Sequence, residues 1–155
     1  MEVMQHSTAP VILSHSNPLG VWRHYRNVRD EAMRACAATG GVVGINGIGF
    51  FLGRNDARTE SIVRHIDYAV QLVGPHHVGL GLDYVFDQQE LVDFLRSNPQ
   101  LFPTEVYGNE PPRLAAPEQI PEIAAALARL GYPPHDVRAI LGGNHVRVAR
   151  SAWKA

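Results

Sequence analysis

"TESIVRHIDYAVQLVGPHHVGLGLD", residues 59–83, is the stretch that decides the fold. Its first part predicts a helix over residues 59–73, because five apolar residues fall on one face at helical spacing: Ile62, Ile66, Ala69, Val70 and Val73. Gly74 and Pro75 end that helix, and the apolar run over residues 77–83 is typical of a buried strand. A helix that leads directly into a buried strand predicts a βαβ unit and a parallel sheet.

The same alternation extends toward the N-terminus. Residues 42–51, "VVGINGIGFF", predict a second strand. Residues 30–39 predict a helix with acidic residues in its first turn, and two glycines end it. Residues 11–14, "VILS", predict a further buried strand. The order strand, helix, strand, helix, strand predicts an α/β fold with three parallel strands.

The last part of the chain is predicted to be helical, after a long irregular segment over residues 84–117. Residues 84–117 are rich in Pro and Asn and poorly periodic, with one short helix near residues 88–96. An amphipathic helix follows over residues 120–131, and two short helices over residues 135–143 and 145–153 complete the pattern. The chain contains no internal repeat and no low-complexity segment.

Length and composition indicate one globular domain over residues 1–155, of which 45% are hydrophobic and 19% charged. The net charge of -1 does not indicate a basic surface that would bind nucleic acid. No apolar run reaches the roughly eighteen residues of a membrane span, and no signal peptide is visible, so we expect a soluble chain and favour the cytoplasm. The single Cys36 lies in a helical pattern and is predicted to be a small buried residue.

Polar residues follow the predicted strands where each strand ends. His15 follows the first strand, residues 46–49 end the second, and Asp83 closes the third, while Arg26 lies a short loop beyond His15. The carboxyl ends of parallel strands share one edge, where α/β enzymes place their chemistry. An imidazole and a carboxylate on one rim suit a hydrolytic metal site, and Arg26 could clamp a substrate carboxylate.

Each of these three residues also has an ordinary structural interpretation. A histidine after a strand commonly hydrogen-bonds within its loop, and an aspartate that closes a strand commonly caps the next turn. An arginine in a loop is most often one half of a surface ion pair. Spacing alone leaves both interpretations open for His15, Arg26 and Asp83, and their shared rim favours a site.

Five motifs in sequence order resemble the C-terminal part of the renal or membrane dipeptidase family: "PVILSHSN", "HYRNVRDE", "ATGGVVGIN", "HIDYAVQLVGPHHVGLGLDY" and "DVRAILGGNHVRV". The similarity runs from Pro10 to Val148. The resemblance implies a binuclear zinc peptidase on an amidohydrolase-type (β/α)8 TIM-type barrel that cleaves dipeptides, often with a D-residue at the C-terminal position. It also implies that the three strands are the sixth, seventh and eighth of that barrel, followed by C-terminal helices.

The resemblance implies a role for each rim residue. His15 of "SHS" would be a zinc ligand, Arg26 of "RN" would contact the dipeptide carboxylate, and Asp83 of "GLGLD" would be the acid/base aspartate. The family's other ligands are a His-x-Asp pair, a bridging Glu and a further His, which the resemblance places upstream of His15. We therefore expect this chain to carry part of the active site and to bind zinc weakly by itself.

The remaining histidines are predicted to be structural or surface residues. His65-Ile66-Asp67 spells His-x-Asp, but residues two apart on a helix point to different faces, so both are predicted to be solvated helix residues. His76 and His77 precede the third strand and are predicted to be structural or surface residues, whereas His135 and His145, near the C-terminal helices, are predicted to be surface groups.

Two functional hypotheses follow. The first is zinc-dependent hydrolysis of dipeptides by a metallodipeptidase, of which this chain is the C-terminal part. The second is a non-catalytic, truncated α/β module that oligomerises or docks on a partner through open sheet edges. A complementing N-terminal portion or a homo-oligomer would cover those edges.

Overall fold

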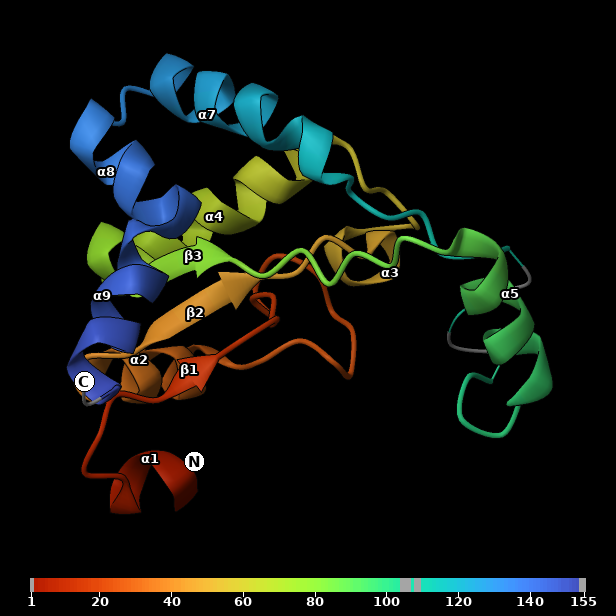
Figure 1. Cartoon of the computed structure of the whole chain (residues 1–155), viewed down its shortest axis with the longest axis horizontal. Coiled ribbons are helices and arrows are strands. Elements are labelled where there is room, and N and C mark those ends of the chain that lie inside the picture. Colours follow the sequence, from red (N-terminus) through yellow and green to blue (C-terminus); the bar gives the residue numbers. More distant parts are fainter. Residues whose placement is uncertain (1, 104–106, 108–109, 154–155) are drawn as a thin grey trace.

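The computed structural model describes residues 2–103, 107 and 110–153 and contains one parallel sheet. Its strands are β1 (Ile12–Leu13), β2 (Val42–Ile45) and β3 (Val78–Leu80), in the order β1-β2-β3 (Figure 1). Val43 of the central strand pairs with Leu13 on one side and with Val78 on the other. The predicted parallel α/β arrangement is confirmed, with each strand shorter than predicted.

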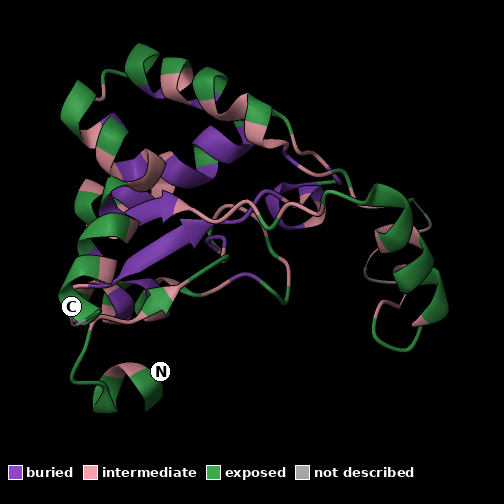
Figure 2. Ribbon diagram, in the orientation of Figure 1, coloured by how far each residue is buried: buried purple, intermediate pink, exposed green. Residues whose placement is uncertain are grey.

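Two helices connect the strands and bury one face of the sheet. They are α2 (Asp30–Ala38) and α4 (Thr59–Val73), and the second has the predicted bounds. Gly74 ends α4 with a φ of 85°, a conformation that favours glycine. The shared core shows as the buried interior in Figure 2 and is built largely from fully buried apolar side chains: Met33, Cys36, Val43, Ile45, Ile62, Ile66 and Val78.

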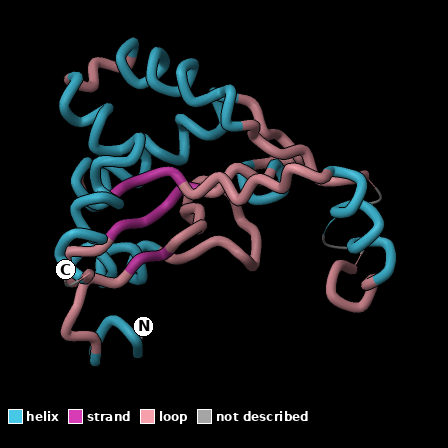
Figure 3. The backbone as a smooth tube through the Cα atoms, in the orientation of Figure 1, coloured by secondary structure: helices cyan, strands magenta, loops and turns pink. Residues whose placement is uncertain are grey.

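The C-terminal elements pack over α4 and the start of the sheet (Figure 3). They are the short turn η2 (Pro117–Gln119), α7 (Ile120–Arg129), α8 (Pro134–Arg138), the π-helical turn η3 (Ala139–Gly143) and α9 (Asn144–Ala152). Asn144 donates hydrogen bonds to the carbonyl oxygens of Pro75 (2.7 Å) and Val78 (2.8 Å). This side chain fixes the start of α9 to the start of β3.

The remaining helices are short: α1 (Glu2–His6), α3 (Gly49–Leu52), the single turn η1 (Pro75–His77) and α5 (Gln88–Ser97). The prediction of a strand over residues 42–51 is wrong in its second half. There the Asn46 Oδ1 accepts a hydrogen bond from the Ile48 amide (2.6 Å), which turns the chain out of the sheet and into α3. Helix α5 matches its prediction, and it projects away from the sheet in Figure 1.

The prediction that His65 is solvated is wrong. Its side chain is fully buried, and Nε2 lies 3.0 Å from the carbonyl oxygen of Leu52 in α3. Helix α4 therefore packs against α3 as well as against the sheet. The contact with α3 buries His65, which lies outside the apolar face predicted from the sequence. Asp67 is half-buried and accepts a hydrogen bond from the Tyr132 hydroxyl (2.7 Å), so it is not a freely solvated residue either.

The other histidines divide between surface and packed positions. His76 and His135 are exposed, as expected, and His77 is half-buried with its Nδ1 2.9 Å from the Gly41 carbonyl oxygen. His145 is a correction, because its ring is half-buried against Gly79 of β3. A Cβ atom on Gly79 would lie 2.3 Å from the His145 Cε1, so this contact requires glycine.

Candidate functional site

A hydrogen-bonded chain of side chains joins the loops that follow the three strands. The buried Asn17 accepts a hydrogen bond from the Asn46 amide (3.0 Å) and donates one to the Asn46 carbonyl oxygen (3.2 Å). The Asn46 Nδ2 then donates to the Asp83 Oδ2 (3.1 Å). Residues that follow β1, β2 and β3 are thereby held together at one edge of the sheet, where the sequence predicts a polar rim.

The backbone and side chain of Asp83 are both constrained. Its φ of 57° lies in the left-handed region, which aspartate tolerates better than most side chains. One carboxylate oxygen is held by Asn46, and the side chain is exposed. Among the described residues no further hydrogen bond to this carboxylate is formed, so its Oδ1 can receive a proton or a ligand.

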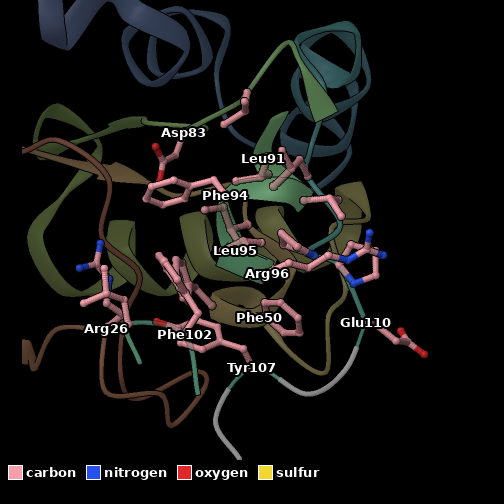
Figure 4. A pocket seen from close by; sticks show the side chains of 18 of the residues that line it. Arg26, Phe50, Asp83, Leu91, Phe94, Leu95, Arg96, Phe102, Tyr107 and Glu110 are labelled. Atoms are coloured by element: carbon pink, nitrogen blue, oxygen red, sulfur yellow. The ribbon is translucent and has the colours of Figure 1, made fainter. Parts of the chain in front are cut away.

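Asp83 and Arg26 open on the same pocket, which has a volume of about 690 Å³. In Figure 4 these two residues lie toward one end of the pocket, and Arg96 and Glu110 lie toward the other. Its walls are largely apolar and come from three parts of the chain. They include Phe50 of α3, Leu91, Phe94 and Leu95 of α5, and Phe102 and Tyr107 beyond α5.

A cluster of aromatic rings lies beside Arg26. Its guanidinium carbon lies 5.8 Å from the centre of the Phe51 ring, which is within the range of a cation–π contact. The His24 ring stacks on Tyr25 at a centroid distance of 4.8 Å and lies 4.9 Å from Phe51. Burial and, to a smaller extent, the charge of Arg26 lower the pKa of His24. His24 is therefore neutral near pH 7, and Arg26 is the cation on this side of the pocket.

The third predicted site residue, His15, does not line this pocket. It is exposed, and its Nδ1 lies 2.7 Å from the Ser14 hydroxyl. Beyond β1 the backbone at Ser14 crosses close over Gly44 and Gly81, where a Cβ atom would lie 2.3 and 1.9 Å from the Ser14 carbonyl oxygen. Within the described part of the chain, no group of three or more His, Cys, Asp or Glu residues could hold a metal ion.

Arg26 and Asp83 were predicted from the sequence, whereas the asparagine network that holds Asp83 and the apolar residues that line the pocket were not. Asn46 follows β2 directly and Asn17 lies in the loop beyond β1, so their place after a strand was the available signal for the amide network. Leu91, Phe94 and Leu95 recur at helical spacing, which was the available signal for an apolar face on α5.

Curated relatives and solved structures match nearly all of this chain, among them the following three. The uncharacterized protein in the pqqA 5' region of Klebsiella pneumoniae is 33% identical over 158 residues, covering 99% of this chain and 51% of the relative. An amidohydrolase from Pseudomonas aeruginosa is 29% identical, with a TM-score of 0.80 over 98% of this chain and 48% of that one. The metallopeptidase named dipeptidase AC is 25% identical, with a TM-score of 0.70 over 99% of this chain and 41% of that one.

These matches confirm the predicted fold class, because the solved structures are TIM-barrel proteins of the amidohydrolase and dipeptidase type. This chain spans about half the length of the Klebsiella relative and less than half of each solved structure. The family model described as membrane dipeptidase, peptidase family M19, matches residues 1–98. The chain therefore belongs to the membrane dipeptidase family, a family of metallopeptidases.

Proposed function

We propose that this chain, as one domain over residues 1–155, supplies the substrate-binding and proton-transfer side of a zinc-dependent dipeptidase site. The observation that carries the proposal is the single pocket shared by Arg26 and Asp83. A guanidinium, a carboxylate and apolar walls in one pocket match the charged end, the peptide bond and the side chains of a short peptide. Membership of the membrane dipeptidase family supports dipeptides as the substrate.

Arg26 binds the terminal carboxylate of the dipeptide through two parallel N–H donors. Hydrolysis breaks the C–N bond, adds the hydroxyl of a water molecule to the carbonyl carbon, and delivers a proton to the amine that leaves. Asp83 holds and transfers that proton at its free carboxylate oxygen, while Asn46 fixes the other oxygen. The amide network thus sets the direction of the acid/base group relative to the bound carboxylate.

The described residues do not by themselves fit the zinc that the family resemblance implies. Catalytic zinc takes about three protein ligands, and the described residues contain no group of three or more His, Cys, Asp or Glu that could hold a metal ion. His15 would contribute a single ligand to zinc, and the others would come from outside the described residues.

The carboxylate role of Arg26 can be tested by binding. Calorimetric titration of the 155-residue chain should show a preference for a dipeptide over the same dipeptide with an amidated C-terminus. Arg26→Ala should remove that preference and weaken dipeptide binding by roughly tenfold, the effect of losing a charge-assisted contact. Arg23→Ala is the matched control, because Arg23 is exposed nearby and does not line the pocket. An unchanged preference in Arg26→Ala would contradict the proposal.

The non-catalytic module is the second candidate, because the outer edges of β1 and β3 are unpaired among the described residues. Ile12 of β1 is 39% exposed, and an open strand edge can pair with another chain. Solution mass and dipeptide hydrolysis at saturating zinc separate the two functions. Hydrolysis supports the dipeptidase, whereas a stable oligomer without hydrolysis or dipeptide binding supports the module.

A further inference from the structure

A second hollow, separate from the pocket of Arg26 and Asp83, is lined by four arginines. It has a volume of about 670 Å³, and none of its lining residues lines the candidate site. We call it the arginine hollow, and its arginines are Arg54, Arg58, Arg64 and Arg113. Arg54 and Arg58 lie between α3 and α4, Arg64 is on α4, and Arg113 comes from the segment that leads to α7.

Asp56 is the one carboxylate among the described residues that line the hollow, and its oxygens already accept hydrogen bonds. Asp56 accepts hydrogen bonds from the Nε and Nη2 of Arg58, both at 2.8 Å, and from the Ser61 hydroxyl at 2.7 Å. The Arg58 guanidinium holds the pKa of Asp56 well below its usual range, so this pair stays ionised and neutralises only itself. Arg54, Arg64 and Arg113 form no ion pair with any described carboxylate.

The backbone that carries these arginines is fixed by hydrogen bonds between two distant segments. Asn55 is buried, with a φ of 51° in the left-handed region. Its Nδ2 donates to the Pro111 carbonyl oxygen (3.0 Å), and its Oδ1 accepts from the Arg113 amide (2.8 Å). The Gly49 amide also donates to the Arg113 carbonyl oxygen (2.8 Å). The arginine hollow therefore has a rigid base.

The guanidinium groups above that base keep most of their donors free. Arg64 uses one Nη2 contact, to the Leu52 carbonyl oxygen (3.2 Å), and the side chains of Arg54 and Arg113 donate no hydrogen bond to a described residue. Each guanidinium carries five N–H donors in a planar fork that matches the oxygens of phosphate. Like charges gathered at one place repel one another, and an anion bound among them removes that repulsion.

We propose that the arginine hollow binds a multiply charged anion of the phosphate class. The guanidinium groups of Arg54, Arg64 and Arg113 form no ion pair among the described residues, so together they match a ligand with two or more negative charges. The oxygens of a phosphate group point in several directions and can accept hydrogen bonds from more than one guanidinium at once. The site is independent of peptide hydrolysis, since it shares no residue with the pocket of Arg26 and Asp83.

Inorganic pyrophosphate is the probe, titrated calorimetrically into the 155-residue chain at constant ionic strength. We expect saturable binding of one anion and a rise in Tm. The double variant Arg54→Gln, Arg113→Gln should weaken binding by at least about tenfold, because each substitution removes a guanidinium group and its charge-assisted hydrogen bonds to the anion. Without anion, the same variant should melt slightly higher than the wild type, because repulsion is relieved.

The matched control is Arg129→Gln, Arg150→Gln, which removes two exposed arginines outside the hollow. Citrate, a polycarboxylate of similar charge, tests the phosphate class. Absence of saturable pyrophosphate binding, equal weakening in the control, or citrate binding as tight as pyrophosphate would each overturn the proposal. Arg54→Gln alone provides a further test if the double variant folds poorly, since the Arg54 side chain donates no hydrogen bond to a described residue.

Discussion

The buried His65 should make the stability of this protein fall as pH drops from 6.5 toward about 4. Burial lowers the pKa of His65 from an ordinary value of 6.5 to about 4. Its Nε2 contacts the Leu52 carbonyl oxygen, and no described group hydrogen-bonds to its Nδ1. Protonation would place a charge and an unpaired N–H group inside the core. Between these two pKa values the unfolded chain therefore binds the proton and the folded chain does not.

The magnitude follows from the two pKa values. His65 destabilises the folded state progressively as pH falls through 6.5 toward about 4, and its neutral form is fully compatible with folding above 6.5. Each unit of pKa difference corresponds to about 1.4 kcal/mol, so moving from about pH 7.5 to about pH 4.5 should remove about 2.5 kcal/mol of stability. Burial also lowers the pKa values of His24 and His145, so they add to the loss with the same sign.

The assay is urea unfolding of wild type and His65→Gln at both pH values, followed by tryptophan fluorescence. Glutamine keeps an N–H donor for the Leu52 carbonyl oxygen and does not titrate. The variant should lose about 2.5 kcal/mol less than the wild type between the two pH values. His76→Gln, which removes an exposed histidine, is the control and should behave as the wild type. Equal losses in wild type and His65→Gln would refute the reasoning.

Three further substitutions test the close approach of the Ser14 backbone to Gly81 and the proposed roles of His15 and Asp83. Gly81→Ala should destabilise the fold by about 1–3 kcal/mol or more in urea unfolding, because the new Cβ would lie 1.9 Å from the Ser14 carbonyl oxygen; an unchanged midpoint would contradict that packing. His15→Ala should lower the zinc content of metal-loaded, dialysed protein, and equal zinc in both proteins would remove His15 as a ligand. Asp83→Asn should reduce dipeptide turnover at saturating zinc with zinc content unchanged; unchanged turnover would exclude proton transfer by Asp83.

The parts of the fold that were predictable depend on local patterns. The apolar stripe of α4 and the glycine after it set the bounds of that helix, and the alternation of elements was sufficient for the parallel sheet. The errors arise where a contact between distant residues decides the outcome. Asn46 turns the chain out of β2 through its own side chain, and His65 is buried because α3 folds back onto α4. Neither contact leaves a periodic signal in the sequence.

The predicted rim divides into two parts: the pocket shared by Arg26 and Asp83, and His15 outside it. Asn17 and Asn46 join the ends of all three strands and place Asp83 beside the pocket that Arg26 also lines. His15 lies outside that pocket, on backbone that crosses over Gly44 and Gly81. The groups proposed to contact the peptide are thus held within this chain, whereas the proposed metal ligand has no partner ligands among the described residues. Peptide binding should therefore survive in the isolated chain even where zinc binding is weak, and measuring the two separately distinguishes an incomplete metal site from an absent substrate site.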